Sequence, residues 1–205
     1  MFYLENQDLS NKRVIIRVDL NVPLDKNSNV TDTTRIEACK GTVNTVIELG
    51  GSCVLISHLG RPKGKEKKLS LKNIVDTVSI IMGRPVLFHE DCIGIDAEKA
   101  TSVLKPGEII LMENLRFYDN EIEGDMTFAE SLSKLGDVYV NDAFGTSHRE
   151  HASTALIAKF FKGNKFAGKL LQKELEVINE IAEKGKKPVL AILGGAKVSS
   201  KLKIL

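Results

Sequence analysis

The sequence predicts an α/β fold, with a doubly wound, mainly parallel sheet in a Rossmann-like three-layer arrangement. A linker helix and the truncated start of a second α/β domain are expected to follow. The apolar runs are short and unbroken, which is typical of strands buried on both faces of a parallel sheet. Segments of helical period lie between these runs, so strand and helix alternate along the chain.

Six apolar runs are predicted as strands: Val14–Val18, Cys53–Ser57, Val86–His89, Ile109–Met112, Val138–Val140 and Val189–Leu193. Five segments of helical period are predicted as helices: Thr33–Leu49, Leu71–Met82, Thr127–Leu135, Thr154–Phe161 and Ala167–Lys184. Ser70 and Asp125 stand where they can cap two of these helices, because short polar side chains accept hydrogen bonds from the free amides at a helix start.

The last predicted helix divides the chain. Its apolar residues Leu171, Leu175 and Ile178 lie along one stripe, and the helix stops before Pro188. The strand that follows cannot bury its own apolar faces together with only the start of a helix. We therefore expect a first domain over residues 1–165, a linker helix over 166–186 and the opening of a second domain over 187–205.

Composition and charge exclude several function classes. A chain of 205 residues can bury a sizeable core. The net charge of +2, from 29 basic and 27 acidic side chains, argues against a protein that coats nucleic acid. The amino terminus lacks the apolar region of a signal peptide, and no stretch approaches the roughly 20 apolar residues of a membrane span. We expect a soluble, cytoplasmic protein with neither nucleic acid nor membrane as a partner.

The cysteines and histidines do not form a metal-binding pattern. Cys39, Cys53 and Cys92 lie in or beside apolar segments without a CxxC pair, so we expect reduced, buried thiols. His148 and His151 have no third ligand in register, and we expect no metal bound by side chains.

Polar side chains gather after the predicted strands. These residues are Asp19, Asn21, His58, Arg61, Glu113, Asn114, Arg116, Asn141, Asp142, His148 and Arg149. In open α/β sheets, ligands bind at the carboxyl ends of the strands, because the loops meet there where the strand order reverses. Three of the seven arginines lie in these loops, and Arg35 begins the first predicted helix.

Several arginines near a histidine favour a phosphate or carboxylate ligand, because each guanidinium offers a planar fork of donors. Two like charges 4 Å apart repel by about 4 kcal/mol at an effective dielectric constant near 20, so the ligand should carry several negative charges. Each residue alone has a simpler interpretation. Arg61 could be a solvated loop residue, Asp19 a helix or turn cap, and Arg116 the surface partner of Glu113 or Asp119. The lysines of residues 63–68 are interpreted as a solvated loop tip that at most steers ligands.

Two segments resemble phosphate-binding motifs to different degrees. Residues 60–66 are one residue short of a P-loop, and Glu66 stands where Ser or Thr would hold magnesium. No GxGxxG pattern follows the first predicted strand, so the fingerprint of a dinucleotide-binding loop is absent from that position. Gly194 and Gly195 end a predicted strand and would let the backbone turn closely against an anion, while Lys197 and Lys201 share one helical face.

Five segments, in order and at similar spacing, resemble the phosphoglycerate kinase family: RVDLNVP (17–23), SHLGRP (57–62), ENLRF (113–117), VNDAFGTSHREHAST (140–154) and LGGAKVSSK (193–201). The resemblance covers essentially the whole chain. It implies a glycolytic transferase that moves a phosphoryl group reversibly between 1,3-bisphosphoglycerate and ADP, giving 3-phosphoglycerate and ATP. It also implies Mg²⁺ on the nucleotide and a monomeric intact enzyme in the cytoplasm.

The resemblance implies roles for residues that match the family's motifs. The residues implied to bind 3-phosphoglycerate are Asp19, Asn21, Arg35, His58, Arg61, Arg116 and Arg149. The residues implied on the nucleotide side are Gly195, Ala196, Lys197 and Lys201. Arg35 and Lys197 would offset charge on the transferring group. Many family members have aspartate where this sequence has Ser200.

Family members are about twice this length, which places the rest of the nucleotide domain beyond residue 205. The resemblance therefore makes residues 1–165 the 3-phosphoglycerate domain and residues 187–205 the start of the nucleotide domain. We expect this chain to bind 3-phosphoglycerate without catalysis by itself. A non-catalytic anion-binding module is the alternative.

Overall fold

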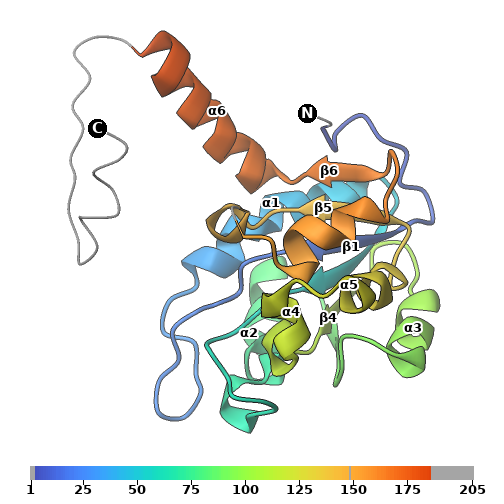
Figure 1. Ribbon diagram of the computed structural model, residues 1–205, viewed down its shortest axis with the longest axis vertical. Coiled ribbons are helices and arrows are strands. Elements are labelled where there is room, and N and C mark those ends of the chain that lie inside the picture. Colours follow the sequence, from blue (N-terminus) through green and yellow to red (C-terminus); the bar gives the residue numbers. More distant parts are fainter. Residues whose placement is uncertain (1–2, 148, 186–205) are drawn as a thin grey trace. The chain divides into compact units, whose positions relative to one another are not determined.

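The computed structural model describes residues 3–147 and 149–185, and in this part of the chain six strands form one sheet (Figure 1). The strands are β1 (Arg13–Arg17), β2 (Ser52–Ile56), β3 (Val86–His89), β4 (Ile109–Met112), β5 (Val138–Asn141) and β6 (Lys165–Ala167). Their spatial order is β3-β4-β2-β1-β5-β6, and each pair of neighbours is parallel. This confirms the predicted parallel α/β class.

Helices cover both faces of the sheet (Figure 1). Val14 and Ile16 of β1 face the core that contains α1 (Thr34–Glu48) and α2 (Val75–Met82). Ile15 faces the opposite core, which contains α3 (Ile95–Ser102) and α5 (Met126–Ser133). Because successive side chains of a strand point to opposite faces, each central strand supplies both cores. This is the predicted three-layer arrangement.

Most predicted elements are present. The first five predicted strands and the first helix agree with the structure to within a residue or two, while Val189–Leu193 lies outside the described residues. Both predicted caps form. The Asp125 carboxylate accepts a hydrogen bond from the Phe128 amide at 2.6 Å, and the Ser70 hydroxyl accepts one from the Lys72 amide at 3.2 Å. Ser70 opens a 3₁₀ turn that precedes α2.

The predicted helix Thr154–Phe161 is wrong. The structure has a single π turn over Ala152–Leu156 and a 3₁₀ turn over Ile157–Lys159. The buried Tyr139 hydroxyl lies 2.8 Å from the Ser153 carbonyl and 3.3 Å from the Thr154 carbonyl, so it engages acceptors that a regular helix would use. This contact comes from a strand that is distant in sequence, which local periodicity does not report.

The strand β6 and the α-helices α3 and α4 (Asp119–Glu123) were not predicted. Because β6 occupies residues up to Ala167, α6 (Lys169–Lys184) begins two residues after the predicted helix start. Segments as short as β6 carry too few residues for a period to stand out.

The chain divides into two compact units, residues 1–173 and residues 174–205. Within the first unit, Asp142 Oδ1 accepts hydrogen bonds from the amides of Leu170 at 2.9 Å and Leu171 at 3.3 Å, which caps the start of α6. A Cβ at Gly168 would come within 2.3 Å of Asp142 Oδ1, so only glycine allows this approach. The predicted domain boundaries at residues 165 and 186 stay predictions.

Cys39, Cys53 and Cys92 are buried free thiols, as predicted. None of the helices in the described residues has the length and apolar character required to cross a membrane.

Candidate functional site

The candidate site lies at the carboxyl edge of the sheet, between β1 and β5. The chain leaves β1 toward β2 on one side and leaves β5 toward β6 on the other, so the strand order reverses here and the two loops diverge. A pocket of about 320 Å³ lies at this edge and contains all seven residues expected to bind the substrate. Its lining residues are Asp19, Asn21, Arg35, His58, Gly60, Arg61, Arg116, Gly145, Thr146 and Arg149. We call it the arginine pocket.

The arginine pocket holds more positive charge than its carboxylates neutralise. Arg35 forms an ion pair with Asp19. In the described part of the chain, Arg61, Arg116 and Arg149 form no ion pair with a carboxylate. Burial, and then the charge of Arg149, lowers the pKa of Arg116. The pocket is thus an electrostatic well for a small anion.

His58 is a neutral imidazole at the floor of this pocket. Its side chain is almost fully buried, at 4% exposure, and its Nδ1 atom lies 3.1 Å from Nη2 of Arg17. Burial lowers the pKa of His58 to about 2, and the charges of Arg17, Arg116, Arg149 and Arg35 act in the same direction. His58 can therefore donate a hydrogen bond to an anion but does not add a positive charge.

The backbone of Gly60 joins the loops that follow β1, β2 and β4. Asn21 Oδ1 accepts a hydrogen bond from the Gly60 amide at 2.7 Å, and Arg116 Nη1 donates to the Gly60 carbonyl at 2.8 Å. Gly60 has a φ of 66°, and a Cβ there would lie 2.7 Å from a methyl group of Leu69. Glycine at this position allows the two pocket side chains to bind the amide and the carbonyl of one residue.

Asn114 links the two loops that carry His58, Arg61 and Arg116 of the pocket. Its Nδ2 atom donates to the carbonyls of Leu59 at 2.8 Å and Leu69 at 2.9 Å. Its Oδ1 atom accepts from the amides of Leu59 at 3.2 Å and Arg116 at 3.0 Å. One fully buried side chain thus holds the start and the end of the loop after β2 against the loop after β4.

Sequence reasoning assigned no role to three buried residues behind the pocket: Arg17, Glu121 and Ser153. Arg17 had a detectable signal, because an arginine inside an otherwise apolar strand requires buried partners. Glu121 and Ser153 had none, since their partners are remote in sequence. Their contacts are Ser153 Oγ to Glu121 Oε1 at 2.6 Å and Arg17 Nε to Ser153 Oγ at 2.9 Å.

The proposed pairing of Arg116 with Glu113 does not form. Glu113 instead accepts hydrogen bonds from the Ser70 hydroxyl at 2.6 Å, the Leu71 amide at 2.8 Å and the Asn114 amide at 2.7 Å. The Glu113 carboxylate is thus occupied by Ser70, Leu71 and the amide that follows it in the chain. Arg116 remains available to the pocket.

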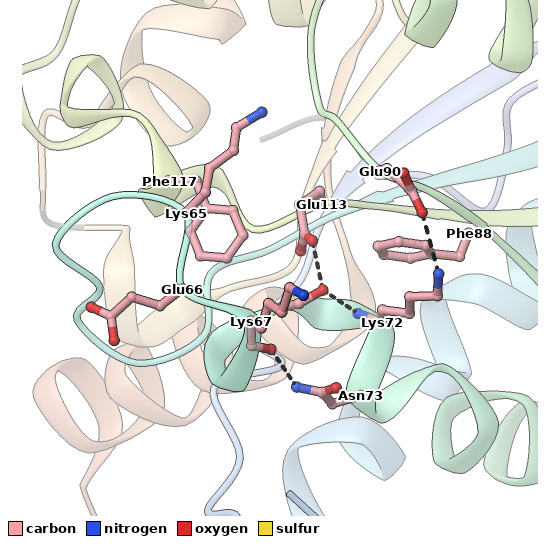
Figure 2. Close-up of a pocket in the computed structure, with 10 residues that line it drawn as sticks. Lys65, Glu66, Lys67, Lys72, Asn73, Phe88, Glu90, Glu113 and Phe117 are labelled. Atoms are coloured by element: carbon pink, nitrogen blue, oxygen red, sulfur yellow. Dashed lines mark hydrogen bonds and ion pairs between the residues drawn. The ribbon is translucent and has the colours of Figure 1, made fainter.

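A second pocket, of about 390 Å³, is lined partly by later residues of the loop after β2 (Figure 2). We call it the lysine pocket; it is lined by Lys65, Glu66, Lys67, Ser70, Lys72, Asn73, Phe88, Glu90, Glu113 and Phe117. Lys72 pairs with Glu90 at 3.2 Å, as Figure 2 shows, and Lys65 pairs with Asp91 at 3.0 Å. The lysine pocket is larger than the arginine pocket, but its three lysines are balanced in number by the carboxylates of Glu66, Glu90 and Glu113.

Four residues that we expected on the nucleotide side lie outside the described residues: Gly195, Ala196, Lys197 and Lys201. His148 lies outside them as well. Their roles stay predictions. In the described residues, no group of three or more His, Cys, Asp or Glu side chains is arranged to hold a metal ion.

Fold and pocket together define the class of protein: a doubly wound α/β protein with a basic pocket where its strand order reverses. A sequence model of the family described as phosphoglycerate kinase matches residues 4–205. The chain belongs to the phosphoglycerate kinase family, and thus to a family of phosphotransferases.

Individual relatives agree with this assignment. The chain is 49% identical to a phosphoglycerate kinase of Azorhizobium caulinodans and 49% identical to a phosphoglycerate kinase of Arabidopsis thaliana that is named cytosolic, in each case over 98% of this chain and 50% of the relative. The crystal structure of phosphoglycerate kinase from Pyrococcus horikoshii superposes with a TM-score of 0.89 at 33% identity, over 100% of this chain and 51% of that one. The chain spans about half the length of the curated relatives it matches.

Proposed function

We propose that this chain supplies the 3-phosphoglycerate-binding part of a phosphoglycerate kinase, which transfers a phosphoryl group reversibly between 1,3-bisphosphoglycerate and ADP. The observation that carries the proposal is the arginine pocket. Three guanidinium groups without a carboxylate partner among the described residues share it with a neutral histidine. A multiply charged phosphate and carboxylate ligand is the chemical complement of such a pocket.

The pocket suggests how the ligand would be oriented. The phosphate would be held by His58, Arg61, Arg116 and Arg149. Asp19 and Asn21 would orient the hydroxyl and carboxylate end, because Asp19 can accept a hydrogen bond from the hydroxyl and the side-chain amide nitrogen of Asn21 can donate one to the carboxylate. A ligand held by arginines at one end and by Asp19 and Asn21 at the other has only one productive direction.

Transfer itself would depend on positioning and charge neutralisation, because phosphoryl transfer requires little covalent work from the protein. Arg35 lies in the pocket and its side chain is half exposed, which leaves it free to reach the transferring group once the ligand competes for Asp19. Lys197 would offset charge from the nucleotide side, where Gly195, Ala196 and Lys201 would contact the ATP phosphates. Magnesium would arrive as a complex with those phosphates.

We further propose that residues 1–205 alone bind 3-phosphoglycerate but do not turn it over. A cytoplasmic location and a monomeric intact enzyme complete the proposal. The nucleotide-side residues would then serve only as part of a larger site.

Calorimetric titration tests this proposal. We expect 3-phosphoglycerate to bind in the high-micromolar to millimolar range and glycerate, which lacks the phosphate, to bind at least tenfold more weakly. Mg–ADP, titrated separately, should show no binding. Equal affinity for glycerate and 3-phosphoglycerate would contradict the assigned phosphate contacts.

A second assay separates the remaining alternatives. Inorganic phosphate that binds as tightly as 3-phosphoglycerate would favour a general anion-binding module over a substrate site. ATP formation from 1,3-bisphosphoglycerate and ADP by the purified 205-residue chain would refute the proposed lack of turnover.

A further inference from the structure

A buried chain of hydrogen bonds runs from Glu121 on α4 to His58 in the arginine pocket. Its members are almost completely inaccessible: Arg17 and Glu121 are 1% exposed, and Ser153 is 0% exposed. Arg17 belongs to β1, Ser153 to the π turn after β5, and His58 to the loop after β2. Tertiary packing therefore connects three buried residues, none of which lines the arginine pocket, to a residue that does.

The chemistry of these groups gives each hydrogen bond a direction. The Ser153 amide and hydroxyl donate to the two oxygens of Glu121, at 2.9 Å and 2.6 Å. With its proton directed at Glu121, the Ser153 oxygen accepts from Arg17 Nε at 2.9 Å. A guanidinium carries donors only, so Arg17 Nη2 donates to Nδ1 of His58 at 3.1 Å.

This direction decides which nitrogen of His58 carries a proton. An Nδ1 atom that accepts from Arg17 has no hydrogen, and a neutral imidazole then carries its hydrogen on Nε2. We propose that Arg17 is a positioning residue that fixes His58 as the neutral Nε2–H tautomer, so that His58 donates a hydrogen bond from Nε2 to the phosphate of the ligand. This inference rests on the function proposed above.

The surroundings of His58 oppose its protonation from several elements. Arg35 on α1, Arg116 after β4 and Arg149 after β5 face it with positive charge, in addition to Arg17. The carboxylate of the pocket, Asp19, is paired with Arg35. The arginines therefore provide the charge for an anion, and His58 provides a directed donor.

Glu121 offsets the free-energy cost of burying the Arg17 guanidinium. A lone guanidinium taken out of water is costly, whereas one held by a hydrogen-bonded carboxylate through Ser153 is compensated. Burial raises the pKa of Glu121, and the charge of Arg17 opposes this shift. Arg17 is further held by its Nη1 atom, which donates to the Val18 carbonyl. The contacts with Ser153 and Val18 thus fix the guanidinium in place for its contact with His58.

Nitrogen NMR of the 205-residue chain, labelled with ¹⁵N-histidine, tests the tautomer directly. Long-range proton–nitrogen spectra between pH 5.5 and 8 should show His58 with an unprotonated Nδ1 and a protonated Nε2 throughout. Adding 3-phosphoglycerate should shift the Nε2–H resonance and leave Nδ1 unprotonated. An imidazolium at pH 7, or the Nδ1–H tautomer, would overturn the inference even if the variants below fail to fold.

Arg17→Met removes the donors and keeps the bulk of the side chain. We expect His58 to become a mixture of both neutral tautomers and the affinity for 3-phosphoglycerate to fall about tenfold. Arg13→Met is the matched control, because Arg13 lies on the same strand but pairs with Asp137 at the opposite end, at 2.8 Å. The control should keep the wild-type tautomer and affinity. An unchanged tautomer in the folded Arg17→Met protein would count against the positioning role.

Two substitutions of His58 test the donor independently. The side-chain amide nitrogen of glutamine takes the place of Nε2, and that of asparagine takes the place of Nδ1. We expect His58→Gln to stay within about fivefold of the wild-type affinity and His58→Asn to lose at least tenfold. The reverse order would refute the inference. Wild-type protein that has the expected tautomer but does not bind 3-phosphoglycerate would instead overturn the proposed function, and with it the ligand contact.

Discussion

The arginine pocket and the lysine pocket both have lining residues from the loop after β2, and they differ in how their charges are paired. In the lysine pocket, Lys65 and Lys72 have carboxylate partners at 3.0 Å and 3.2 Å. In the arginine pocket, ion pairing among the described residues is limited to Arg35 with Asp19. The denser run of basic residues in the sequence therefore belongs to the pocket with less uncompensated charge.

This difference teaches that a run of basic residues is weak evidence for an anion site. Flexible lysines in a loop find nearby carboxylates and water, and exposed pairs of this kind contribute little to stability. The arginines of the other pocket lie in loops that follow three separate strands, so the fold itself keeps them near one another. Their repulsion persists until a ligand arrives, which makes the arginine pocket the better candidate.

The largest expected effect comes from Asn114, which supports the loop after β2 that contributes residues to both pockets. Asn114→Ala should lower the free energy of unfolding by about 3–5 kcal/mol, because it leaves buried carbonyls of Leu59 and Leu69 without donors. Chemical denaturation followed by circular dichroism measures this change. Asn73→Ala is the matched control: Asn73 also donates to a loop carbonyl, that of Lys67 at 2.9 Å, but it is exposed. A control effect equal to that of Asn114→Ala would remove burial as the explanation.

A buried carboxylate at the same sheet edge, Asp142, extends the comparison to a negative charge that has no ion pair among the described residues. Burial raises the pKa of Asp142 from 3.8 to about 6, and hydrogen bonds from Thr42, Leu171 and Leu170 oppose this shift. Between these pH values the folded state keeps a proton that the unfolded chain has released. The contribution of Asp142 to stability is therefore highest below pH 4, and it is lost as pH rises to about 6.

Asp142→Asn should remove this pH dependence. We expect the unfolding free energy of the variant, relative to the wild type, to rise by up to about 3 kcal/mol between pH 4 and pH 6.5. Urea denaturation at several pH values measures it, and Asp125→Asn, at an N-cap that is more exposed, is the control. A constant difference between wild type and variant across this range would show that Asp142 titrates normally.

Affinity for 3-phosphoglycerate separates the two pockets most directly. Arg61→Met should weaken binding at least tenfold, or about 1.4 kcal/mol, because it removes a charged donor from the arginine pocket. Lys67→Met, farther along the same loop and in the lysine pocket, should change the affinity less than about twofold. Calorimetry on both variants measures this. Equal losses would mean that the ligand senses only the net charge of the loop.

The smallest expected effect concerns the protein without ligand. Removing one of several repelling charges should stabilise the empty pocket, so Arg61→Met should raise the free energy of unfolding by about 0.5 kcal/mol at low ionic strength. The gain should vanish in high salt, because Arg61 is exposed and its charge is screened. Lys72→Met, which breaks the pair with Glu90, should give no such gain. Thermal unfolding at two salt concentrations tests both expectations.

The fold was largely predictable because its signal is local. Unbroken apolar runs such as Val14–Val18 and Ile109–Met112 mark strands that are buried on both faces, whatever their neighbours are. The prediction failed at Thr154–Phe161, where the Tyr139 hydroxyl engages two carbonyls from across the core. It also missed β6, which has three residues. Each miss comes from contacts or lengths that a periodic pattern does not contain.

The residues that line the candidate site could be predicted from the sequence, whereas the buried residues that hold them in place could not. Polar residues after successive strands must meet at one edge of a parallel sheet, so Asp19, His58 and Arg116 could be grouped without coordinates. The partners that hold them, such as Ser153 and Glu121, follow no spacing rule. Only the fold shows that they are within hydrogen-bonding distance.

By itself, the sequence of this protein determined the class of fold, the edge of the sheet that carries the polar residues and the family resemblance, since each depends on residue type and order along the chain. Tertiary structure alone decided which charges are neutralised and which are not. Charge pairing depends on distances of a few ångströms between side chains that are far apart in sequence. Lys65 and Arg61 lie in one loop, and packing gave a carboxylate partner only to Lys65 of the two, among the described residues.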